Sequence, residues 1–251
     1  MNFRDLRIFL TGAIAAGLLV ILTEGWSFKE YPISFQIRLS SDLAGKYAGA
    51  DSQDVVVDAN DARALFVGDS ITKSWPKASE NRNAGIPGAG ATLIGQRFAS
   101  EIRGGSPNYV HILAGTNDVG GGRDAPSIAI IGSMVDEARR RNIPVIVGTI
   151  PPIDALLFPH LSPYVAQFNL SLVAEVKPKG AFIADYYKAM SNPDGSQNRS
   201  LFLDGIHPND AGYAVMTKVL RETRREMYRT IYTPEQRKAW REKRKAGREA
   251  K

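Results

Sequence analysis

Cysteine is missing from the 251-residue chain, and histidine occurs three times, as His111, His160 and His207. Without cysteine the protein cannot hold a disulfide framework, a thiolate zinc site, an iron–sulfur cluster or a cysteine nucleophile. So few histidines also argue against a metal site built from several of them. The sequence therefore implies neither a metal nor an organic cofactor. The missing cysteine does not identify the cellular compartment, because many exported proteins carry no disulfide.

An excess of positive charge is also missing from most of the chain. Residues 221–251 carry 12 Lys and Arg against 5 Asp and Glu, whereas the other 220 residues carry 20 against 21. The net charge of +6 therefore comes from the C-terminal segment, which argues against a nucleic-acid-binding fold with a basic face. With 43% hydrophobic and 23% charged residues, the composition is that of a globular domain with its own core.

A long hydrophobic run lies near the N-terminus. Ile8–Thr23 is 16 residues long without a charge, and Arg4 and Arg7 precede it. As a helix this run would span about 24 Å, less than a hydrocarbon core of about 30 Å, so residues 1–25 fit either an uncleaved membrane anchor or a cleaved signal peptide. A buried helix of the domain is a third alternative. Because an anchor or a signal would both export the rest of the chain, we expect an extracytoplasmic protein, either periplasmic or secreted.

The segments on either side of the domain differ in character. Residues 26–62 are mixed and weakly periodic, and we expect them to form a linker before a domain over residues 63–232. After Pro234 the chain has eight Lys and Arg, three Glu and, as its one large apolar residue, Trp240. We expect residues 233–251 to form a solvated basic tail. A loose contact of this tail with an anionic lipid or polymer is the alternative.

Strand-like and helix-like segments alternate from residue 63 onward. Apolar runs predict buried strands at Arg63–Val67, Tyr109–Ala114, Val145–Ile150 and Ala181–Ala184. Apolar residues at helical spacing predict helices at Ala91–Arg103, Ser127–Arg141 and Tyr164–Val176, and from Asp210 to about Tyr232. Strands that are apolar on both faces and are separated by helices predict an α/β fold, a three-layer α/β/α sandwich with a mostly parallel sheet. Ligands of such sheets bind beyond the carboxyl ends of the strands.

Two motifs directly follow predicted strands. Gly68-Asp69-Ser70 comes after the first, where a sharp turn would present the Ser70 hydroxyl at the sheet edge. Gly115–Asp118 comes after the second, where the side-chain amide of Asn117 can donate hydrogen bonds into a pocket. Taken alone, each motif is also ordinary turn chemistry.

Two further motifs lie in predicted loops. Asn83–Gly88 is rich in glycine, so its backbone can approach a ligand closely, although a flexible turn explains this motif equally well on its own. Asp204 and His207 are three residues apart before the last helix and can meet side chain to side chain. The carboxylate would then accept a hydrogen bond from Nδ1–H, and the other ring nitrogen would act as a base. Together the four motifs supply a nucleophile, oxyanion donors and an oriented base.

The four motifs resemble the four sequence blocks of the SGNH (GDSL-type) hydrolases, and the resemblance covers about residues 63–225. Two smaller segments, Pro144–Pro152 and His207–Tyr213, are also similar to family segments. Among subgroups, the chain is most similar to bacterial secreted acetylhydrolase-like esterases. The resemblance implies a flavodoxin-like α/β/α fold and a serine esterase that works through an acyl-enzyme.

The resemblance also implies a role for each site residue. We expect His207 to take the proton of Ser70, whose oxygen attacks an ester carbonyl, and Asp204 to orient His207 and stabilise its charged form. We expect the oxyanion to be held by the backbone N–H groups of Ser70 and Gly85 and by the side chain of Asn117. Water would then release the acyl group.

Four other polar residues of these segments are interpreted as structural. His111 lies inside a predicted strand and His160 in a loop, so neither is expected to act in catalysis. Asp69 and Asp118 are interpreted as carboxylates that stabilise a turn or cap a helix, rather than as second bases.

The substrate is less well determined than the reaction. Three loops are expected to line its pocket: Val119–Arg123, Asp154–Leu161 and Ser191–Phe202. Short acyl groups, in particular acetyl, on a glycan remain possible, as do longer acyl chains on a lysophospholipid or thioester. O-acyl transfer to a glycan by the same residues is an alternative function, and a non-catalytic, membrane-tethered binding module is another.

Overall fold

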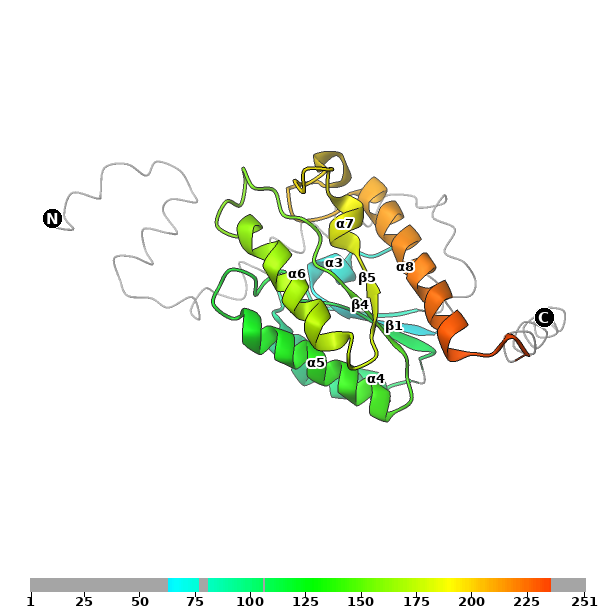
Figure 1. Ribbon diagram of the computed structural model, residues 1–251. Helices are drawn as coiled ribbons and strands as arrows, with labels where there is room; N and C mark the ends of the chain where they lie inside the picture. The colour runs from blue at the N-terminus through cyan, green and yellow to red at the C-terminus, as the bar shows by residue number, and fades with distance from the viewer. Residues whose placement is uncertain (1–62, 77–80, 106, 236–251) are drawn as a thin grey trace, which may run out of the picture. The chain divides into compact units, whose positions relative to one another are not determined.

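Five parallel strands form the centre of the fold (Figure 1). The computed structural model describes residues 63–76, 81–105 and 107–235. In chain order the strands are β1 (Ala64–Gly68), β2 (Arg82–Gly85), β3 (Tyr109–Leu113), β4 (Val145–Gly148) and β5 (Phe182–Ala184). Their spatial order, β2-β1-β3-β4-β5, is that of flavodoxin-like doubly wound folds. The prediction of a three-layer α/β/α fold with a parallel sheet is therefore confirmed.

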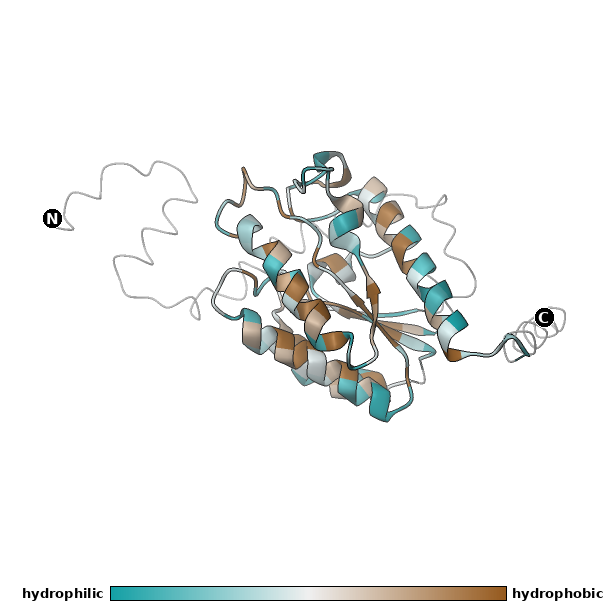
Figure 2. Ribbon diagram, in the orientation of Figure 1, coloured by the Kyte–Doolittle hydropathy of each residue, from teal (hydrophilic) through white to brown (hydrophobic). Residues whose placement is uncertain are grey.

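Helices cover both faces of the sheet. One face packs against α4 (Ala91–Arg103), α5 (Asp124–Arg140) and α6 (Ser162–Val176), and the other against α3 (Ser70–Lys73), α7 (Tyr186–Met190) and α8 (Asp210–Ile231). Alternate strand residues supply the two cores. Leu65 and Val67 of β1 face the first group of helices, and Phe66 faces the second. Figure 2 shows the matching pattern, with hydrophobic residues along the strands and mixed character around each helix.

Long apolar periodicities in the sequence indicated the main elements well. Helix α4 has the predicted bounds, and the ends of the other predicted strands and helices differ from the structure by a few residues. Helix α5 ends where expected, because Asn142 adopts a positive φ of 57° before Ile143-Pro144. Helix α8 reaches Ile231, as its apolar stripe predicts.

The interpretation of Asn83–Gly88 as a loop is wrong for its first half. Residues 82–85 form β2, an edge strand that pairs with β1 along its whole length. The segment Arg-Asn-Ala-Gly lacks both apolar alternation and β-branched residues, so its strand conformation comes from pairing with the backbone of β1. Two short helices, α3 and α7, were also not predicted.

Several predictions for the ends of the chain concern residues outside those that the structure describes. These are the anchor or signal peptide at residues 1–25, the linker at residues 26–62, and the part of the basic tail beyond residue 235. Within the described ranges, no helix combines the length and the apolar character that a membrane crossing requires.

Candidate active site

Ser70 and His207 meet at the carboxyl edge of the sheet. Ser70 follows β1 as the first residue of α3, and His207 lies in the loop just before α8. Although 137 residues separate them in the chain, Ser70 Oγ lies 2.9 Å from His207 Nε2. That distance is a normal hydrogen bond, so the serine hydroxyl and the imidazole are in position to exchange a proton.

Asp204 occupies the other side of the imidazole. Its Oδ2 lies 2.8 Å from His207 Nδ1, and its Oδ1 accepts the backbone N–H groups of His207 and Ile206 at 2.8 and 3.0 Å. Burial opposes the charge of this carboxylate, but the hydrogen bonds from the ring and the two backbone N–H groups more than offset it and lower the pKa of Asp204. A charged Asp204 accepts a hydrogen bond from the Nδ1–H of His207, which leaves Nε2 free to accept the proton of Ser70.

Contacts among three elements bring the serine to the histidine. The hydroxyl of Tyr213, in the first turns of α8, donates to the carbonyl of Ile71 in α3 at 2.9 Å. From β2, Asn83 Nδ2 donates to the carbonyl of Thr72 at 2.7 Å. Helix α3 is therefore held by α8 on one side and by the edge strand on the other.

A close approach of backbone explains the glycine before the serine turn. A Cβ built on Gly68 would lie 2.0 Å from the carbonyl oxygen of Leu113 and 2.2 Å from Oγ1 of Thr72. Any side chain here would push α3 away from the ends of β1 and β3. The glycine therefore allows the chain to turn sharply enough for Ser70 to lie over the sheet edge.

The loop after β3 lies against the start of α4. Asn117 Nδ2 donates to the carbonyl of Ala89 at 3.1 Å, which leaves its second amide hydrogen for another acceptor. Next to it, Asp118 Oδ2 accepts the N–H of Ala91 at 2.9 Å. The N-cap residue of α4, Gly90, has no side chain, so the carboxylate of Asp118 caps this helix from the neighbouring loop. The interpretation of Asp118 as a cap is confirmed.

The backbone N–H of Gly85, which was expected to hold the oxyanion, is used within the fold instead. Its N–H donates to Oδ1 of Asn83 at 2.9 Å and so is already engaged. A Cβ at this position would lie 2.3 Å from the backbone nitrogen of Lys73, so Gly85 allows β2 to pack directly against α3. In the described part of the chain the N–H of Gly88, next to Ala89, has no protein partner.

Comparison with known proteins identifies the family. A model of the GDSL-like lipase/acylhydrolase family matches residues 66–215. The chain belongs to this family. Membership implies hydrolysis of ester bonds, and the matched residues include every motif described above. Among curated proteins, none matches the chain significantly.

Solved structures share the fold of this GDSL-like protein. A GDSL-like lipase from Bacteroides thetaiotaomicron has a TM-score of 0.59 and 23% identity, with 73% of this chain and 98% of that one covered. A lipase/acylhydrolase from Enterococcus faecalis has a TM-score of 0.56 and 22% identity, with 65% of this chain and 96% of that one covered. A variant of an acetyl-xylooligosaccharide esterase from Geobacillus has a TM-score of 0.54 and 19% identity, with 64% of this chain and 93% of that one covered.

The aspartate of the GDSL-like motif is a buried cap. Asp69 has no exposed surface, and its Oδ1 accepts the N–H of Ile71 at 2.9 Å at the start of α3. Burial raises the pKa of Asp69 to about 6. The second oxygen, Oδ2, has no hydrogen-bond partner among the described residues. Asp69 thus shapes the serine turn, as predicted, and does not contact His207 through a hydrogen bond that the structure records.

The other two histidines form no recorded hydrogen bond with Ser70 or His207. His111 is fully buried in β3, where its Nε2 lies 2.9 Å from the Tyr186 hydroxyl. Burial lowers the pKa of His111 to about 3, so the ring is neutral in the folded protein. His160 is exposed in the loop before α6. The prediction that His111 is structural is confirmed.

Sequence reasoning missed the contacts that hold the loop of Asp204 and His207. Gln197 Nε2 donates to the carbonyls of Gly205 and Pro152, at 2.8 and 2.7 Å, and the Asp154 N–H also donates to Gly205. Arg199 forms an ion pair with the buried carboxylate of Asp154 at 2.5 Å. Apart from their position in loops expected to line the site, nothing in the sequence singles out these side chains.

Proposed function

We propose that the protein is a serine esterase that hydrolyses short-chain carboxylic esters, in particular acetyl esters, through an acyl-enzyme. The observation that carries this proposal is the 2.9 Å contact between Ser70 Oγ and His207 Nε2, with Asp204 on the opposite ring nitrogen. Nucleophile, base and orienting carboxylate form one chain of hydrogen bonds, which is the arrangement that activates a serine hydroxyl.

The first half of the reaction transfers the acyl group to the enzyme. As Ser70 Oγ attacks the ester carbonyl, its proton moves to His207 Nε2, and Asp204 stabilises the resulting imidazolium. His207 then gives this proton to the departing alcohol oxygen, the ester C–O bond breaks, and the acyl group remains on Ser70. In the second half, His207 takes a proton from water as the water oxygen attacks the acyl carbonyl carbon. The bond between that carbon and Ser70 Oγ then breaks, His207 returns the proton to Ser70, and the free acid is released.

The negative charge that develops on the carbonyl oxygen requires hydrogen-bond donors. Two expected donors, the N–H of Ser70 and the side-chain amide of Asn117, remain in this proposal. Because Asn83 engages the N–H of Gly85, we assign the third position to the N–H of Gly88, which lies beside the Asn117–Ala89 contact. Removal of one such donor typically costs about 3 kcal/mol of transition-state stabilisation.

The acetyl preference rests on two lines of support. The sequence is most similar to acetylhydrolase-like esterases, and one structural neighbour is by its name an acetyl-xylooligosaccharide esterase. That neighbour acts on an acetylated oligosaccharide, so we propose a small acyl group on a glycan as the substrate class.

Replacement of Ser70 tests the proposal. We expect Ser70→Ala to lower kcat for p-nitrophenyl acetate by about 10⁴-fold or more, because the nucleophile is lost. A matched control is Ser133→Ala on the exposed face of α5, whose hydroxyl bonds only to its own helix at Ala129. Circular dichroism and melting temperature should be alike in both variants. Turnover by folded Ser70→Ala at the rate of the control would refute the assignment.

A further inference from the structure

A pocket of about 360 Å³ lies beside the Asp204–His207 loop, and its lining does not include Ser70 or His207. It is formed by the loop after β4, the start of α6, the helix α7 and residues 192–199. Two of the three loops expected to line a substrate pocket therefore contribute to it, and Val119–Arg123 does not. Its volume lies within the range of small-molecule binding sites.

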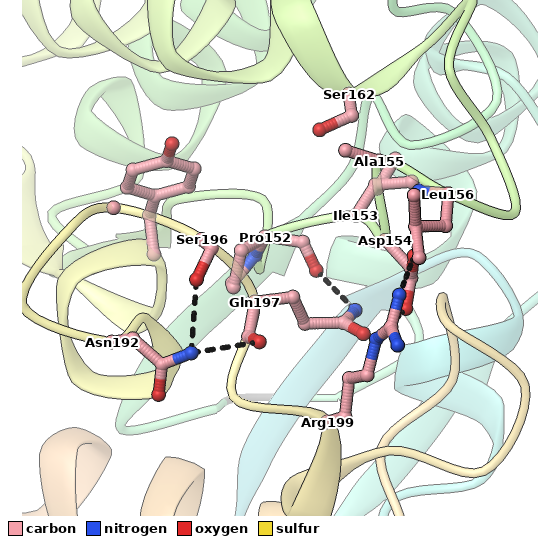
Figure 3. A pocket seen from close by; sticks show the side chains of 12 residues that line it. Pro152, Ile153, Asp154, Ala155, Leu156, Ser162, Asn192, Ser196, Gln197 and Arg199 are labelled. Atoms are coloured by element: carbon pink, nitrogen blue, oxygen red, sulfur yellow. Dashed lines mark hydrogen bonds and ion pairs between the residues drawn. The ribbon is translucent and has the colours of Figure 1, made fainter.

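The lining combines polar side chains with apolar surface and is nearly free of net charge. Figure 3 shows Asn192 and Ser196 on one side of the pocket, Arg199 and Asp154 on the other, and Gln197 between them. Asp154 and Arg199 are the charged members of the lining, and they neutralise each other in a two-point ion pair. The pocket therefore has no uncompensated cation that would attract a phosphate group.

Several polar atoms of the lining have no partner in the described part of the chain. The hydroxyls of Tyr187 and Ser162 accept and donate no hydrogen bond that the structure records. Asn192 uses its Nδ2 to hold Ser196 and the carbonyl of Gln197, and its Oδ1 remains unpaired. Two hydroxyls and an amide oxygen next to the apolar surface of Ile153 suit a ligand with many hydroxyl groups and apolar C–H faces.

One residue joins this pocket to the catalytic loop. Gln197, 7% exposed, lines the pocket and donates through Nε2 to the carbonyl of Gly205, between Asp204 and His207. The backbone N–H of Asp154, another lining residue, donates to the same carbonyl at 2.9 Å. The pocket and the histidine loop thus share a wall at the Gly205 carbonyl.

We propose that this pocket is a sugar-binding subsite, which holds an unmodified sugar residue of an O-acylated oligosaccharide while a neighbouring residue presents its ester to Ser70. The inference rests on the proposed esterase function and specifies the alcohol portion of the substrate. An acyl chain in this pocket would leave the Tyr187 and Ser162 hydroxyls and Asn192 Oδ1 without hydrogen bonds, and a phospholipid headgroup would require an unpaired cation.

The test compares two substrates in variants that lose one hydroxyl each. The substrates are partly acetylated cellotetraose, which retains free hydroxyls, and p-nitrophenyl acetate, which has no sugar. We expect Tyr187→Phe and Ser162→Ala each to lower the ratio of kcat/KM for the sugar ester to that for p-nitrophenyl acetate by about fivefold, mainly through a higher KM. The inhibition constant of unmodified cellotetraose should rise by the same factor. Tyr164→Phe, at an exposed tyrosine of α6 outside the pocket, should leave the ratio unchanged.

The outcomes separate this inference from the function on which it rests. If the wild type hydrolyses p-nitrophenyl acetate through Ser70 but not the acetylated sugar, the sugar subsite is wrong and the esterase stands. An unchanged ratio and an unchanged inhibition constant in both variants would also overturn the subsite. If neither substrate is hydrolysed, the proposed function fails and the subsite fails with it.

Discussion

The two faces of the central sheet have cores of different chemistry. Toward α4, α5 and α6 the buried cluster is aliphatic, and in the described chain Phe98 and Phe168 are its only buried aromatic members. Toward α3, α7 and α8 the cluster contains Trp75, Tyr186 and Tyr213, and the ring of His111 packs against both Trp75 and Tyr186. The hydrophobic core on the first face is thus built from aliphatic side chains and two phenylalanines, and the core on the other face combines apolar rings with polar ends.

The polar ends of the second face lead to the site. The ring of Tyr213 packs against Trp75, just beyond α3, while its hydroxyl bonds to Ile71 within α3. The same ring thus contributes to the core and holds the helix that begins with Ser70. Directional hydrogen bonds position the nucleophile here, whereas the aliphatic face contributes mainly non-directional burial. We expect substitutions in the two faces to separate stability from activity.

The largest effect on stability is expected on the aliphatic face. Leu172→Ala in α6 removes a fully buried side chain and should lower the free energy of unfolding by about 2–5 kcal/mol. Because no bond of Leu172 leads to α3 or to His207, kcat per folded molecule should stay within about twofold of the wild type. Urea unfolding and p-nitrophenyl acetate turnover measure the two quantities. A tenfold loss of kcat in the folded variant would contradict this distinction between the faces.

A smaller, pH-dependent effect is expected at His111. Burial lowers its pKa to about 3 in the folded protein, while an unfolded histidine titrates near about 6.5. As the pH falls below about 6.5, the unfolded chain gains a proton that the native protein cannot take up, so this group destabilises the fold. The free energy of unfolding of the wild type relative to His111→Phe should therefore fall by about 2.5 kcal/mol between pH 7 and pH 4.5.

Asp69 also titrates in this pH range, but it does not change the difference in stability between the wild type and His111→Phe. Burial raises its pKa to about 6, so the native protein takes up a proton there that the unfolded chain takes up only at lower pH, which favours the fold as the pH falls. Both proteins contain Asp69, and its contribution cancels in their difference. A difference in stability that stays constant from pH 7 to pH 4.5 would show that His111 is not held neutral.

The smallest effect is expected from Tyr213→Phe, which keeps the ring and removes the hydroxyl. Loss of the hydrogen bond to Ile71 should lower the free energy of unfolding by about 1 kcal/mol and lower kcat several-fold, because α3 carries Ser70. In contrast to Leu172→Ala, the loss of activity should exceed what the small loss of stability predicts. Unchanged kcat with lowered stability would mean that Tyr213 acts in the core alone.

The sequence predicted those parts of the fold and site that depend on periodicity and on local spacing. Apolar runs revealed four of the five strands, and a spacing of three residues was enough to pair Asp204 with His207. The cap roles of Asp69 and Asp118 also followed from their places after strands.

Features that depend on contacts between distant segments could not be predicted in this way. Residues 82–85 adopt a strand conformation because they pair with β1. Within β2, the N–H of Gly85 donates to the side chain of Asn83. The contact of Gln197 with Gly205 joins two irregular loops that have no periodicity. Such hydrogen bonds become visible only when the fold brings the segments together.

Chemical labelling tests the central claim, that Ser70 and His207 act as one unit, most directly. A fluorophosphonate probe forms a stable adduct with a serine that a base activates, and mass spectrometry of peptides locates it. We expect an adduct on Ser70 in the wild type and labelling at least about 100-fold slower in His207→Ala. An adduct on a different serine, or equal labelling of Ser70 without the histidine, would contradict it.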